Sequence, residues 1–414
     1  MTFRIDAASM FDGEGFVRDA SLVVDGPTII FAGPRAELPP EYQSLSADAV
    51  ATLTPGLWDV HTHFFGVRQM TMAEMLQTRD AVAGMRVAKD AERLLAAGFT
   101  SVREAGGYGV HLAAAIEEGT VIGPRIYGAG AVLSPTAGHG DLPGAPLEWL
   151  TGDPHPPQFH LCDGVDECIR AVRLQIRKGA RVIKVCASGG ILGAHDSPHH
   201  QHFSDAELRA IVEEASLTGR TVMAHATGKA GILASVRAGV RTIEHGTYLD
   251  QECVDAMLEA GVILVPTLSV GRSMLRRSAA LSAAAADKLR DAVERSSSSV
   301  QLAYAAGVPI AAGSDFGTSG PDSPTPQERG IDEIGHLQEA GLSPVDALRA
   351  ATSVAASTLG DSALASGRLR AGADADFLEV GVSLEDDAAL IATPGAVRRV
   401  WKAGKMVVSH LDQK

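Results

Sequence analysis

The stretch AERLLAAGFTSVREAG, residues 91–106, contains in one piece the unit that decides the fold. Alanine, leucine, glutamate and arginine with helical spacing run up to Gly98, and the short apolar run Thr100–Glu104 follows at once. A glycine directly after a helical stretch is typical of a helix C-cap. The same Ala-Gly-Phe or Ala-Gly-Val punctuation ends at Phe99, Val240, Val262 and Val308. The stretch therefore predicts a helix that leads straight into a buried strand.

Eight apolar, strand-like runs occur in the middle of the chain. They are Leu57–His61, Thr100–Glu104, Arg125–Gly130, Val182–Ala187, Thr221–His225, Thr242–His245, Ile263–Thr267 and Ile310–Asp315. Helix-like stretches lie between and after them, at Met72–Ala97, Val110–Gly119, Val165–Lys178, Asp205–Thr218, Lys229–Ala238, Gln251–Ala260, Ala283–Ala306, Gln327–Ala340 and Pro344–Leu359. Strands that are apolar throughout and alternate with helices predict a parallel sheet, and eight such units predict a (β/α)8 TIM barrel.

The two ends of the chain have a different pattern. Residues 1–52 and 366–414 contain short alternating runs separated by turn signals such as Asp25-Gly26 and Ala403-Gly404, which are typical of hairpins. Each end is too short to bury a core of its own. We therefore predict an α/β protein whose barrel spans residues 53–365, with a small β-sandwich built from both termini.

Composition narrows the class of protein. Apolar residues make up 45% and charged residues 21%, which is typical of a globular chain, and the net charge is −14. This acidity disfavours nucleic acid and anionic membranes as partners. There is no apolar run of transmembrane length and no apolar signal-peptide segment near Met1. The four cysteines form no CxxC pair, so we expect reduced thiols and a cytoplasmic protein.

Polar side chains gather where the predicted strands end, which is where barrel enzymes carry their active sites. His61 and His63 are two residues apart in one strand and therefore face the same side. A single His-x-His pair is weak evidence, and buried histidines satisfied by hydrogen bonds are the alternative. Further strand ends carry Lys184, His225, His245 and Asp315, so the alternative would have to hold at every histidine. The set predicts a metal site.

Lys184 is the unusual member of this set, because an ammonium group would repel metal cations. A buried cationic lysine is also costly. A lysine converted to its carbamate becomes a bidentate anionic ligand that could bridge two metals. Cys186 shares the strand face of Lys184, and we interpret it as a small filler of the barrel interior.

Five stretches together resemble the amidohydrolase superfamily: PGLWDVHTH at 55–63, VIKVCASGG at 182–190, MAHA at 223–226, IEHGTYLD at 243–250 and GSDFG at 313–317. The resemblance is closest to the branch of metal-dependent carboxypeptidases, which are prolidase-like Xaa-dipeptidases, and of ochratoxin-type amidohydrolases. Imidazolonepropionase is a more distant member. The similarity extends over nearly the whole chain.

The resemblance implies two divalent metal ions, most often zinc. His61, His63 and Asp315 would hold one, His225 and His245 the other, with N6-carboxylated Lys184 and a hydroxide as bridges. Imidazole nitrogens and carboxylate oxygens suit zinc, and metal pairs suit hydrolysis. The hydroxide would attack an amide carbonyl, and Asp315 would pass the proton to the leaving amine.

Two further residues match the branch as donors to the oxyanion. They are His139 in TAGHGD and Tyr248 in HGTYLD. Their alternative interpretation is as ordinary loop residues in contact with solvent. Residues 195–202 form a histidine-rich segment that could bind a third metal or serve as a substrate loop, and Glu104 is interpreted as structural.

The resulting prediction is a binuclear metal-dependent hydrolase of an amide or peptide bond in a small molecule, a dipeptide, an N-acyl amino acid or an ochratoxin-like compound. A dipeptidase needs a cation for the α-carboxylate, and Arg68, Arg103 and Arg329 are the candidates. Hydrolysis of a cyclic amide, as by imidazolonepropionase, is the first alternative. A non-catalytic barrel scaffold is the second, and the complete ligand set disfavours it. We expect a homo-oligomer.

Overall fold

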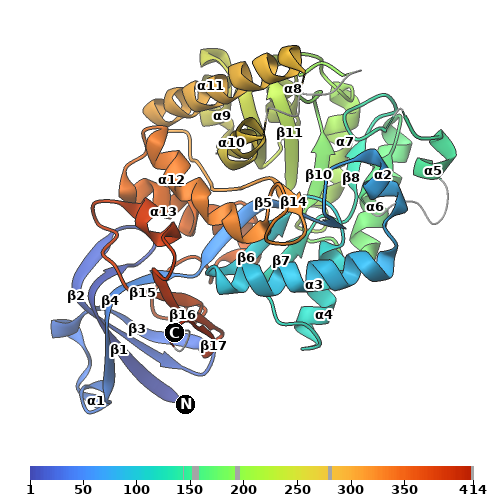
Figure 1. Cartoon of the computed structure of the whole chain (residues 1–414). Coiled ribbons are helices and arrows are strands. Elements are labelled where there is room, and N and C mark those ends of the chain that lie inside the picture. Colours follow the sequence, from blue (N-terminus) through green and yellow to red (C-terminus); the bar gives the residue numbers. More distant parts are fainter. Residues whose placement is uncertain (143, 152–157, 192–195, 278–281, 412–414) are drawn as a thin grey trace.

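The computed structural model describes residues 1–142, 144–151, 158–191, 196–277 and 282–411. Strands from the beginning and the end of the chain lie side by side at one end of the molecule (Figure 1). The remaining strands and most helices form a larger body next to them. No helix in these ranges is both long and apolar enough to span a membrane.

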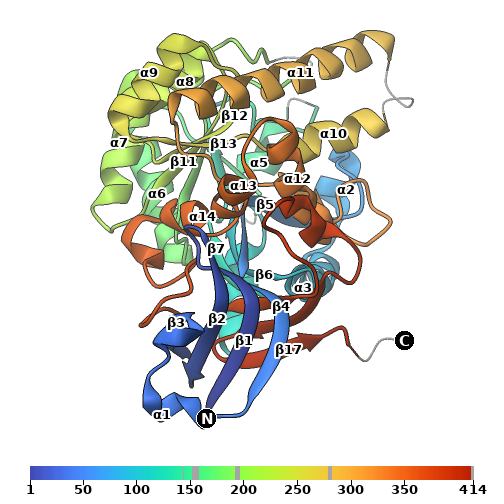
Figure 2. The ribbon, with the colours of Figure 1, turned by 90° about the vertical axis from the view of Figure 1, so that its left-hand side faces the viewer.

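Both termini contribute to one seven-stranded sheet, as the hairpin signals predict. Its order is β17 (Lys405–Ser409), β16 (Val397–Lys402), β15 (Phe377–Val380), β4 (Ala47–Pro55), β1 (Thr2–Phe11), β2 (Phe16–Asp25) and β3 (Thr28–Pro34). β15 pairs antiparallel with β4, so the C-terminal strands extend a sheet begun by the N-terminal ones (Figure 2). The sheet encloses its own buried cluster, which includes Leu22, Leu53 and Phe377.

The middle of the chain forms two parallel sheets. One has the order β13 (Ile263–Val265), β12 (Thr242–Tyr248), β11 (Val222–Gly228), β10 (Ile183–Cys186), β8 (Val132–Ser134) and β9 (Phe159–Leu161). The other has the order β14 (Phe316–Thr318), β5 (Leu57–Val67), β6 (Phe99–Glu104) and β7 (Arg125–Gly128). The prediction of an α/β fold with parallel strands is confirmed.

Backbone contacts join the two sheets on both sides. On one side the Gly128 carbonyl of β7 accepts a hydrogen bond from the Arg181 amide, just before β10, at 2.9 Å. On the other, Ile310 bridges to Leu264 of β13, and the Ala312 carbonyl accepts a hydrogen bond from the Val60 amide of β5 at 3.0 Å. The segment before β14 therefore lies between β13 and β5.

Two predicted strands are less regular than expected. Arg125–Gly130 is interrupted because Gly130 has a φ of 75°, after which the Ala131 amide donates to the side chain of Gln175. Ile310–Asp315 makes only an isolated bridge, and regular pairing starts at Phe316. Asp315 has a φ of 56°, which takes the backbone out of the extended conformation.

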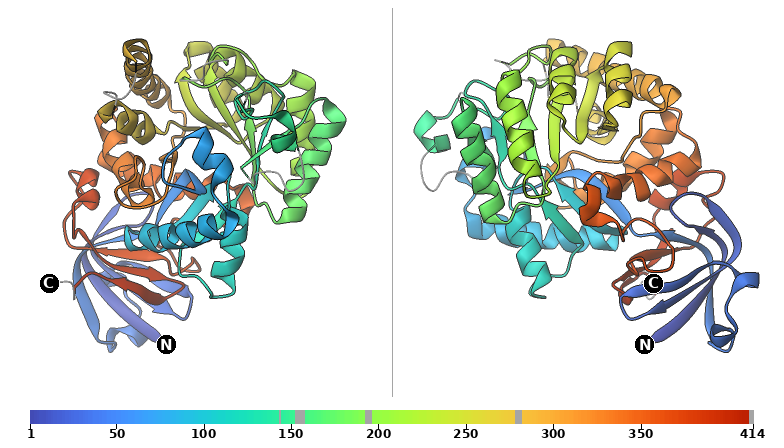
Figure 3. Two further views of the ribbon diagram at one scale, coloured as in Figure 1. Left: turned by 45° about the vertical axis from the view of Figure 1, so that its right-hand side comes forward. Right: turned by 180° about the vertical axis from the view of Figure 1, so that it is seen from behind.

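Helices lie around the outside of the strands (Figure 3). They are α2 (Met72–Gln77), α3 (Asp80–Ala96), α4 (Gly109–Glu117), α5 (Leu147–Thr151), α6 (Val165–Lys178), α7 (Asp205–Ser216), α8 (Lys229–Ala238), α9 (Gln251–Ala260), α10 (Leu268–Arg276), α11 (Ala283–Ala306), α12 (Asp332–Glu339), α13 (Pro344–Ala350) and α14 (Ser353–Ser357). A short helix, α1 (Pro40–Gln43), lies next to the terminal sheet. α10 was not predicted.

The stretch that decides the fold shows why glycine ends the helix. α3 buries Val87, Ala91, Leu94 and Leu95, with the three- and four-residue spacing of an apolar helical face. Gly98 then takes a φ of 104°, and a Cβ there would lie 2.9 Å from Leu378 of β15. Glycine thus permits both the left-handed turn into β6 and the close contact with the terminal sheet.

Candidate active site

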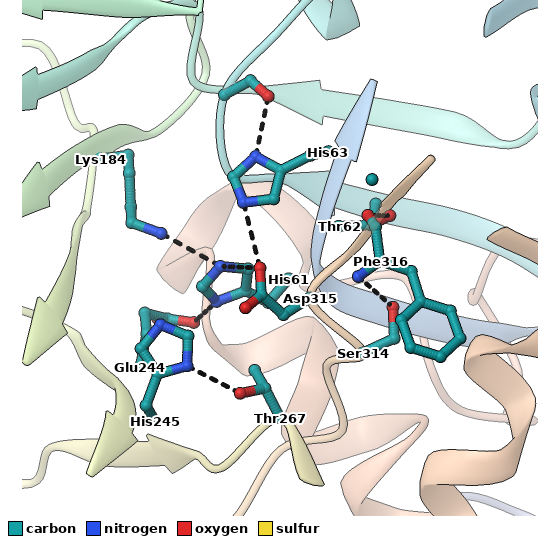
Figure 4. Close-up of polar contacts among 12 residues, drawn as sticks. His61, Thr62, His63, Lys184, Glu244, His245, Thr267, Ser314, Asp315 and Phe316 are labelled. Carbon is teal, nitrogen blue, oxygen red and sulfur yellow. Dashed lines mark hydrogen bonds and ion pairs between the residues drawn. The ribbon is translucent and has the colours of Figure 1, made fainter. Parts of the chain in front are cut away.

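The six predicted metal ligands line one cavity of about 460 Å³. His61 and His63 come from β5, Lys184 from β10, His225 from β11 and His245 from β12. Asp315 comes from the turn before β14. We call these six residues the floor of the cavity, and Figure 4 shows five of them, His61, His63, Lys184, His245 and Asp315, lying close together.

The two histidines of β5 meet at Asp315. His61 Nε2 lies 3.4 Å and His63 Nε2 3.2 Å from Asp315 Oδ1. Thr62 between them points away and donates a hydrogen bond to the Phe316 carbonyl at 2.9 Å, as strand alternation requires. The ligand atoms of His61, His63 and Asp315 all lie within 4.8 Å of one another and could hold a metal ion.

Lys184 faces this group from the opposite strand. Its Nζ donates to His61 Nε2 at 3.1 Å, and the side chain is buried. Burial lowers the pKa of the Lys184 ammonium. Burial opposes ionisation of Asp315 too, but the pKa of that carboxyl is held well below its usual range by His61, His63 and His245. The floor therefore combines an ionised carboxylate with a lysine pushed toward its neutral form.

His225 and His245 complete the group on the other side. Their ring centroids are 4.6 Å apart, and the His61 and His245 rings are 5.1 Å apart. Burial lowers the pKa of His245 to about 4 and that of His225 below its usual value. Both imidazoles are therefore neutral at pH 7, the form in which histidine binds metals.

The histidines are held through the ring nitrogen that points away from the group. His61 Nδ1 contacts Glu244 Oε2 at 2.7 Å, His63 Nδ1 donates to the Gly106 carbonyl at 2.9 Å, and His245 Nδ1 contacts Thr267 Oγ1 at 2.7 Å. Nε2 is the other nitrogen of each ring, and that of His61 accepts the hydrogen bond from Lys184. Such outer contacts fix the tautomer and orientation of metal-binding histidines.

Glu244 is itself held in a buried ion pair. Arg103 Nη2 donates to Glu244 Oε1 at 2.9 Å, and its Nε donates to the Val60 carbonyl at 2.6 Å. Both side chains are completely buried. Arg103 thus balances the charge of the carboxylate that supports His61.

Backbone strain is concentrated at this site. His245, Thr267 and Asp315 have φ angles of 72°, 51° and 56° although none of them is glycine. Residues held in this left-handed region often lie at functional sites.

Asp59, beneath the floor, accepts hydrogen bonds from the His61 amide at 3.0 Å and from the Ser314 hydroxyl at 2.6 Å, which ties β5 to the turn that carries Asp315.

Residues 52–407 of the chain match the sequence profile of the Amidohydrolase family. The chain belongs to the amidohydrolase family. This confirms the resemblance found in the sequence.

Named relatives of this amidohydrolase are hydrolases. It is 40% identical over 417 residues to an ochratoxinase of Aspergillus niger, and the aligned region covers 95% of this chain and 84% of the relative. The crystal structure of A. niger ochratoxinase superimposes with a TM-score of 0.91 at 38% identity, over 98% of this chain and 95% of that one. A prolidase complexed with N-methylphosphonate-L-proline gives a TM-score of 0.87 at 31% identity, covering 99% and 100%. An imidazolonepropionase of Pseudomonas aeruginosa is 29% identical over 293 residues, 63% of this chain and 67% of the relative.

The two predicted oxyanion donors of the amidohydrolase differ in position. His139 lines the cavity, and its ring stacks on His225 with centroids 4.3 Å apart. Tyr248 is not among the lining residues that the structure describes. Its ring contacts His199 at a centroid distance of 4.9 Å, and burial and Asp291 raise the pKa of its hydroxyl.

The three candidate arginines do not line the cavity in the described part of the chain. Arg103 is wrong as a candidate for a substrate carboxylate, because it is completely buried against Glu244. Arg68 is exposed, and Arg329 pairs with Asp332 at the surface. In the histidine-rich segment, His195 lies outside the described residues. Glu104 is buried and accepts from the Gly109 and Ala129 amides, which agrees with a structural role.

Sequence reasoning missed the residues that support the site. Glu244 directly precedes the predicted ligand His245, and Thr267 ends a predicted strand. Both residues therefore lie at positions where the sequence predicts the site. What the sequence lacked was the partner of each, since His61 and Glu244 are 183 residues apart.

Proposed function

We propose that this amidohydrolase is a binuclear metal-dependent hydrolase that cleaves an amide or peptide bond in a small molecule. The observation that carries the proposal is the convergence of four histidines, Lys184 and Asp315 on the floor of one cavity, with the outer nitrogens of the rings engaged. The family membership and the named hydrolase relatives support the reaction class.

The donor set fits two divalent ions. Imidazole nitrogens and carboxylate oxygens are the ligands zinc prefers. His61, His63 and Asp315 would hold one ion and His225 and His245 the other, with Lys184 between them as its carbamate. Two bound ions would supply Lewis-acid polarisation of the carbonyl and a lowered pKa for water.

Lys184 is suited to carbamate formation. Its lowered pKa favours the neutral amine, which can attack carbon dioxide with loss of one proton. The new N–C bond leaves an anionic carboxylate on the side chain. This conversion replaces a cation beside His61 with a bidentate oxygen ligand.

Asp315 is positioned to move the proton of the reaction. Its carboxylate is ionised, so it can accept a proton from the attacking water. As the amide C–N bond breaks, the same carboxyl returns the proton to the leaving nitrogen. His139, which lines the cavity, would stabilise the charge that develops on the carbonyl oxygen, and Tyr248 would need to move toward the cavity to do so.

The cavity favours an amide that carries a bulky apolar group. Around the polar floor it is lined by apolar side chains from several elements, among them Phe65, Phe159, Val270, Met274 and Val293. An N-aroyl amino acid, an apolar dipeptide or ochratoxin, the compound for which the A. niger relative is named, would bury apolar surface here.

Cyclic amide hydrolysis is the second candidate, favoured by the similarity to imidazolonepropionase. A small polar ring would leave the apolar walls without contact, so the lining supports the linear amide better.

Residues 53–365 are proposed to form the (β/α)8 barrel, supported by the contacts that join its two sheets. Residues 1–52 and 366–414 are proposed to form the composite β-sandwich.

Metal analysis combined with a substrate panel tests the proposal. The purified protein should contain close to two divalent ions per chain. It should hydrolyse N-(2-naphthoyl)-L-phenylalanine or ochratoxin faster than it hydrolyses Xaa-Pro dipeptides or a cyclic imidazolone. A chelator should abolish turnover, and added zinc should restore it. Full activity of the metal-free protein, or turnover of the cyclic substrate alone, would contradict the proposal.

A further inference from the structure

The imidazole of His139 is fixed on two sides. Its ring lies nearly parallel to that of His225, with an interplanar angle of 15°. Its Nδ1 lies 2.7 Å from Asp196 Oδ2. With Nδ1 engaged, Nε2 is the ring nitrogen available to a carbonyl oxygen in the cavity.

Asp196 reaches His139 from another loop. His139 follows β8, whereas Asp196 belongs to the loop after β10. The Asp196 side chain is only 10% exposed, and the same Oδ2 also accepts the Gly190 amide at 2.8 Å. Burial opposes ionisation, yet the His139 and Gly190 hydrogen bonds hold the pKa of Asp196 at about 2. The carboxylate is therefore charged and held from two directions.

Two glycines of this loop, Gly189 and Gly190, lie too close to their neighbours to be replaced by a residue with a side chain. A Cβ on Gly190 would lie 2.2 Å from His139 Cε1, and a Cβ on Gly189 would lie 2.4 Å from the Ser197 carbonyl oxygen. Gly190 thus packs closely against the imidazole, and Gly189 against Ser197 of the same loop. The His139 amide also donates to His202 Nδ1 at 3.2 Å, so the loop holds both backbone and side chain of His139.

We propose that Asp196 is a positioning residue that orients His139 toward the scissile amide. The inference rests on the proposed function, in which His139 stabilises the oxyanion. It adds that the loop after β10 completes the catalytic group presented by the loop after β8. A carboxylate on the remote nitrogen of a working histidine fixes the direction in which the ring points.

A double-mutant cycle tests this inference on the metal-loaded protein, with N-(2-naphthoyl)-L-phenylalanine as the probe. His139→Ala should lower kcat about 10²–10³-fold, the usual cost of an oxyanion donor. Asp196→Ala should lower kcat at least 10-fold and change KM by less than about threefold, because orientation matters most in the transition state. Combined with His139→Ala, it should cause no further loss. Asp196→Asn should recover part of kcat, because its amide oxygen can still accept from Nδ1.

Asp163 offers a matched control. It anchors the same His139 loop by accepting the Thr136 amide at 2.9 Å and hydroxyl at 2.7 Å, and it does not contact His139 in the structure. Asp163→Ala should therefore leave kcat within about twofold. Metal content should be the same in all variants. In 15N-histidine spectra the hydrogen-bonded Nδ1 proton of His139 should disappear in Asp196→Ala, a readout that needs no substrate.

The outcomes separate this inference from the proposed function. Additive losses in the double variant, an equal loss in Asp163→Ala, metal loss in Asp196→Ala or an unchanged Nδ1 proton would overturn the role of Asp196 alone. A wild-type protein that hydrolyses no amide would overturn the proposed function, and the catalytic meaning of this contact with it.

Discussion

Each histidine proposed to bind metal has at least one ring nitrogen committed to a neighbour. The committed contacts of His61, His63 and His245 are to Glu244, the Gly106 carbonyl and Thr267, and His225 Nε2 donates to the Gly189 carbonyl at 3.3 Å. Four rings are thus oriented before any ligand binds. This pre-organisation lowers the entropic cost of assembling a metal site.

Lys184 gives the sharpest prediction at this scale. Lys184→Ala should lose the bridging ligand and with it most of the activity, because the alanine methyl group offers no oxygen ligand. Acetate or propionate added with zinc should restore part of kcat, since a free carboxylate fits the space left by the side chain. Steady-state kinetics with metal analysis measures both effects.

Two variants complete this prediction. Lys402→Ala removes a half-buried lysine, one that donates to the Gly123 carbonyl from the terminal sheet, and should leave activity and metal content unchanged. Normal rate and metal content in Lys184→Arg would rule out the carbamate, because arginine cannot form it.

Among the secondary-structure elements, α10 and α11 shape the apolar part of the cavity. α10 follows β13 through Thr267, and it lines the cavity with Val270 and Met274. α11 adds Leu289 and Val293. These two helices therefore form the wall that a bulky substrate group would contact.

Filling this wall should discriminate between substrates by size. Val270→Trp should lower kcat/KM for N-(2-naphthoyl)-L-phenylalanine at least 10-fold and leave N-acetyl-L-phenylalanine within about twofold, because only the larger acyl group needs the space. Val82→Trp, on the outer face of α3 at 37% exposure, is the matched control and should change neither. Equal losses for both substrates would show that α10 does not form the acyl pocket.

A carboxylate from α12 holds the start of α10. Glu333 accepts hydrogen bonds from the Leu268 amide at 2.9 Å and the Ser269 amide at 2.7 Å, next to Thr267 and hence next to the support of His245. Burial raises the pKa of Glu333 to about 7 from an ordinary value of 4.5. A negative charge near a helix N-terminus stabilises the helix, but here the cost of burying the ionised carboxylate exceeds what the contact with the α10 amides supplies.

The raised pKa predicts a pH-dependent stability. Since the folded protein binds this proton more tightly than the unfolded chain, the stability contribution of Glu333 falls between about pH 4.5 and 7 and then levels off. Between pH 5 and 8 the loss is about 2–3 kcal/mol. Glu333→Gln lacks this proton, so the melting temperature of the wild type should fall relative to that of the variant over this range. Parallel melting curves would contradict the assignment.

At the scale of the whole molecule, the chain ends stabilise one another. Trp401 of β16 stacks on Phe3 of β1 with centroids 4.7 Å apart and on Phe377 of β15 at 5.3 Å, and its Nε1 donates to Glu379 at 2.8 Å. One indole thus joins three strands from opposite ends of the sequence. None of these contacts involves the cavity.

Loss of this indole should separate stability from activity. Trp401→Ala should lower the free energy of unfolding by about 3 kcal/mol, the range for removing a large packed aromatic group, while kcat at 25 °C stays within about twofold. Thermal melting and steady-state kinetics measure the two effects. Trp401→Phe should keep most of the stability, and a large drop in kcat in Trp401→Ala would show that the terminal sheet reaches the site.

The sequence by itself determined the class of fold and which six residues line the floor of the cavity. Helix–glycine–strand units such as residues 91–106 are local patterns, because helix capping and strand burial depend on neighbours a few residues away. His61 and His63 share a face through strand alternation alone. Family membership followed from five motif stretches, among them PGLWDVHTH at 55–63, and is confirmed. The metals, the subunit assembly and the role of Tyr248 stay predictions.

Only the tertiary structure decided what supports and limits the site. Arg103 follows from the sequence as a candidate for a substrate carboxylate, yet folding buries it against Glu244, which is 141 residues away. Asp196 meets His139 across 57 residues, and α10 reaches the cavity although no signal predicted it. Contacts of this kind depend on how two distant segments pack, and no local spacing in the chain records that geometry.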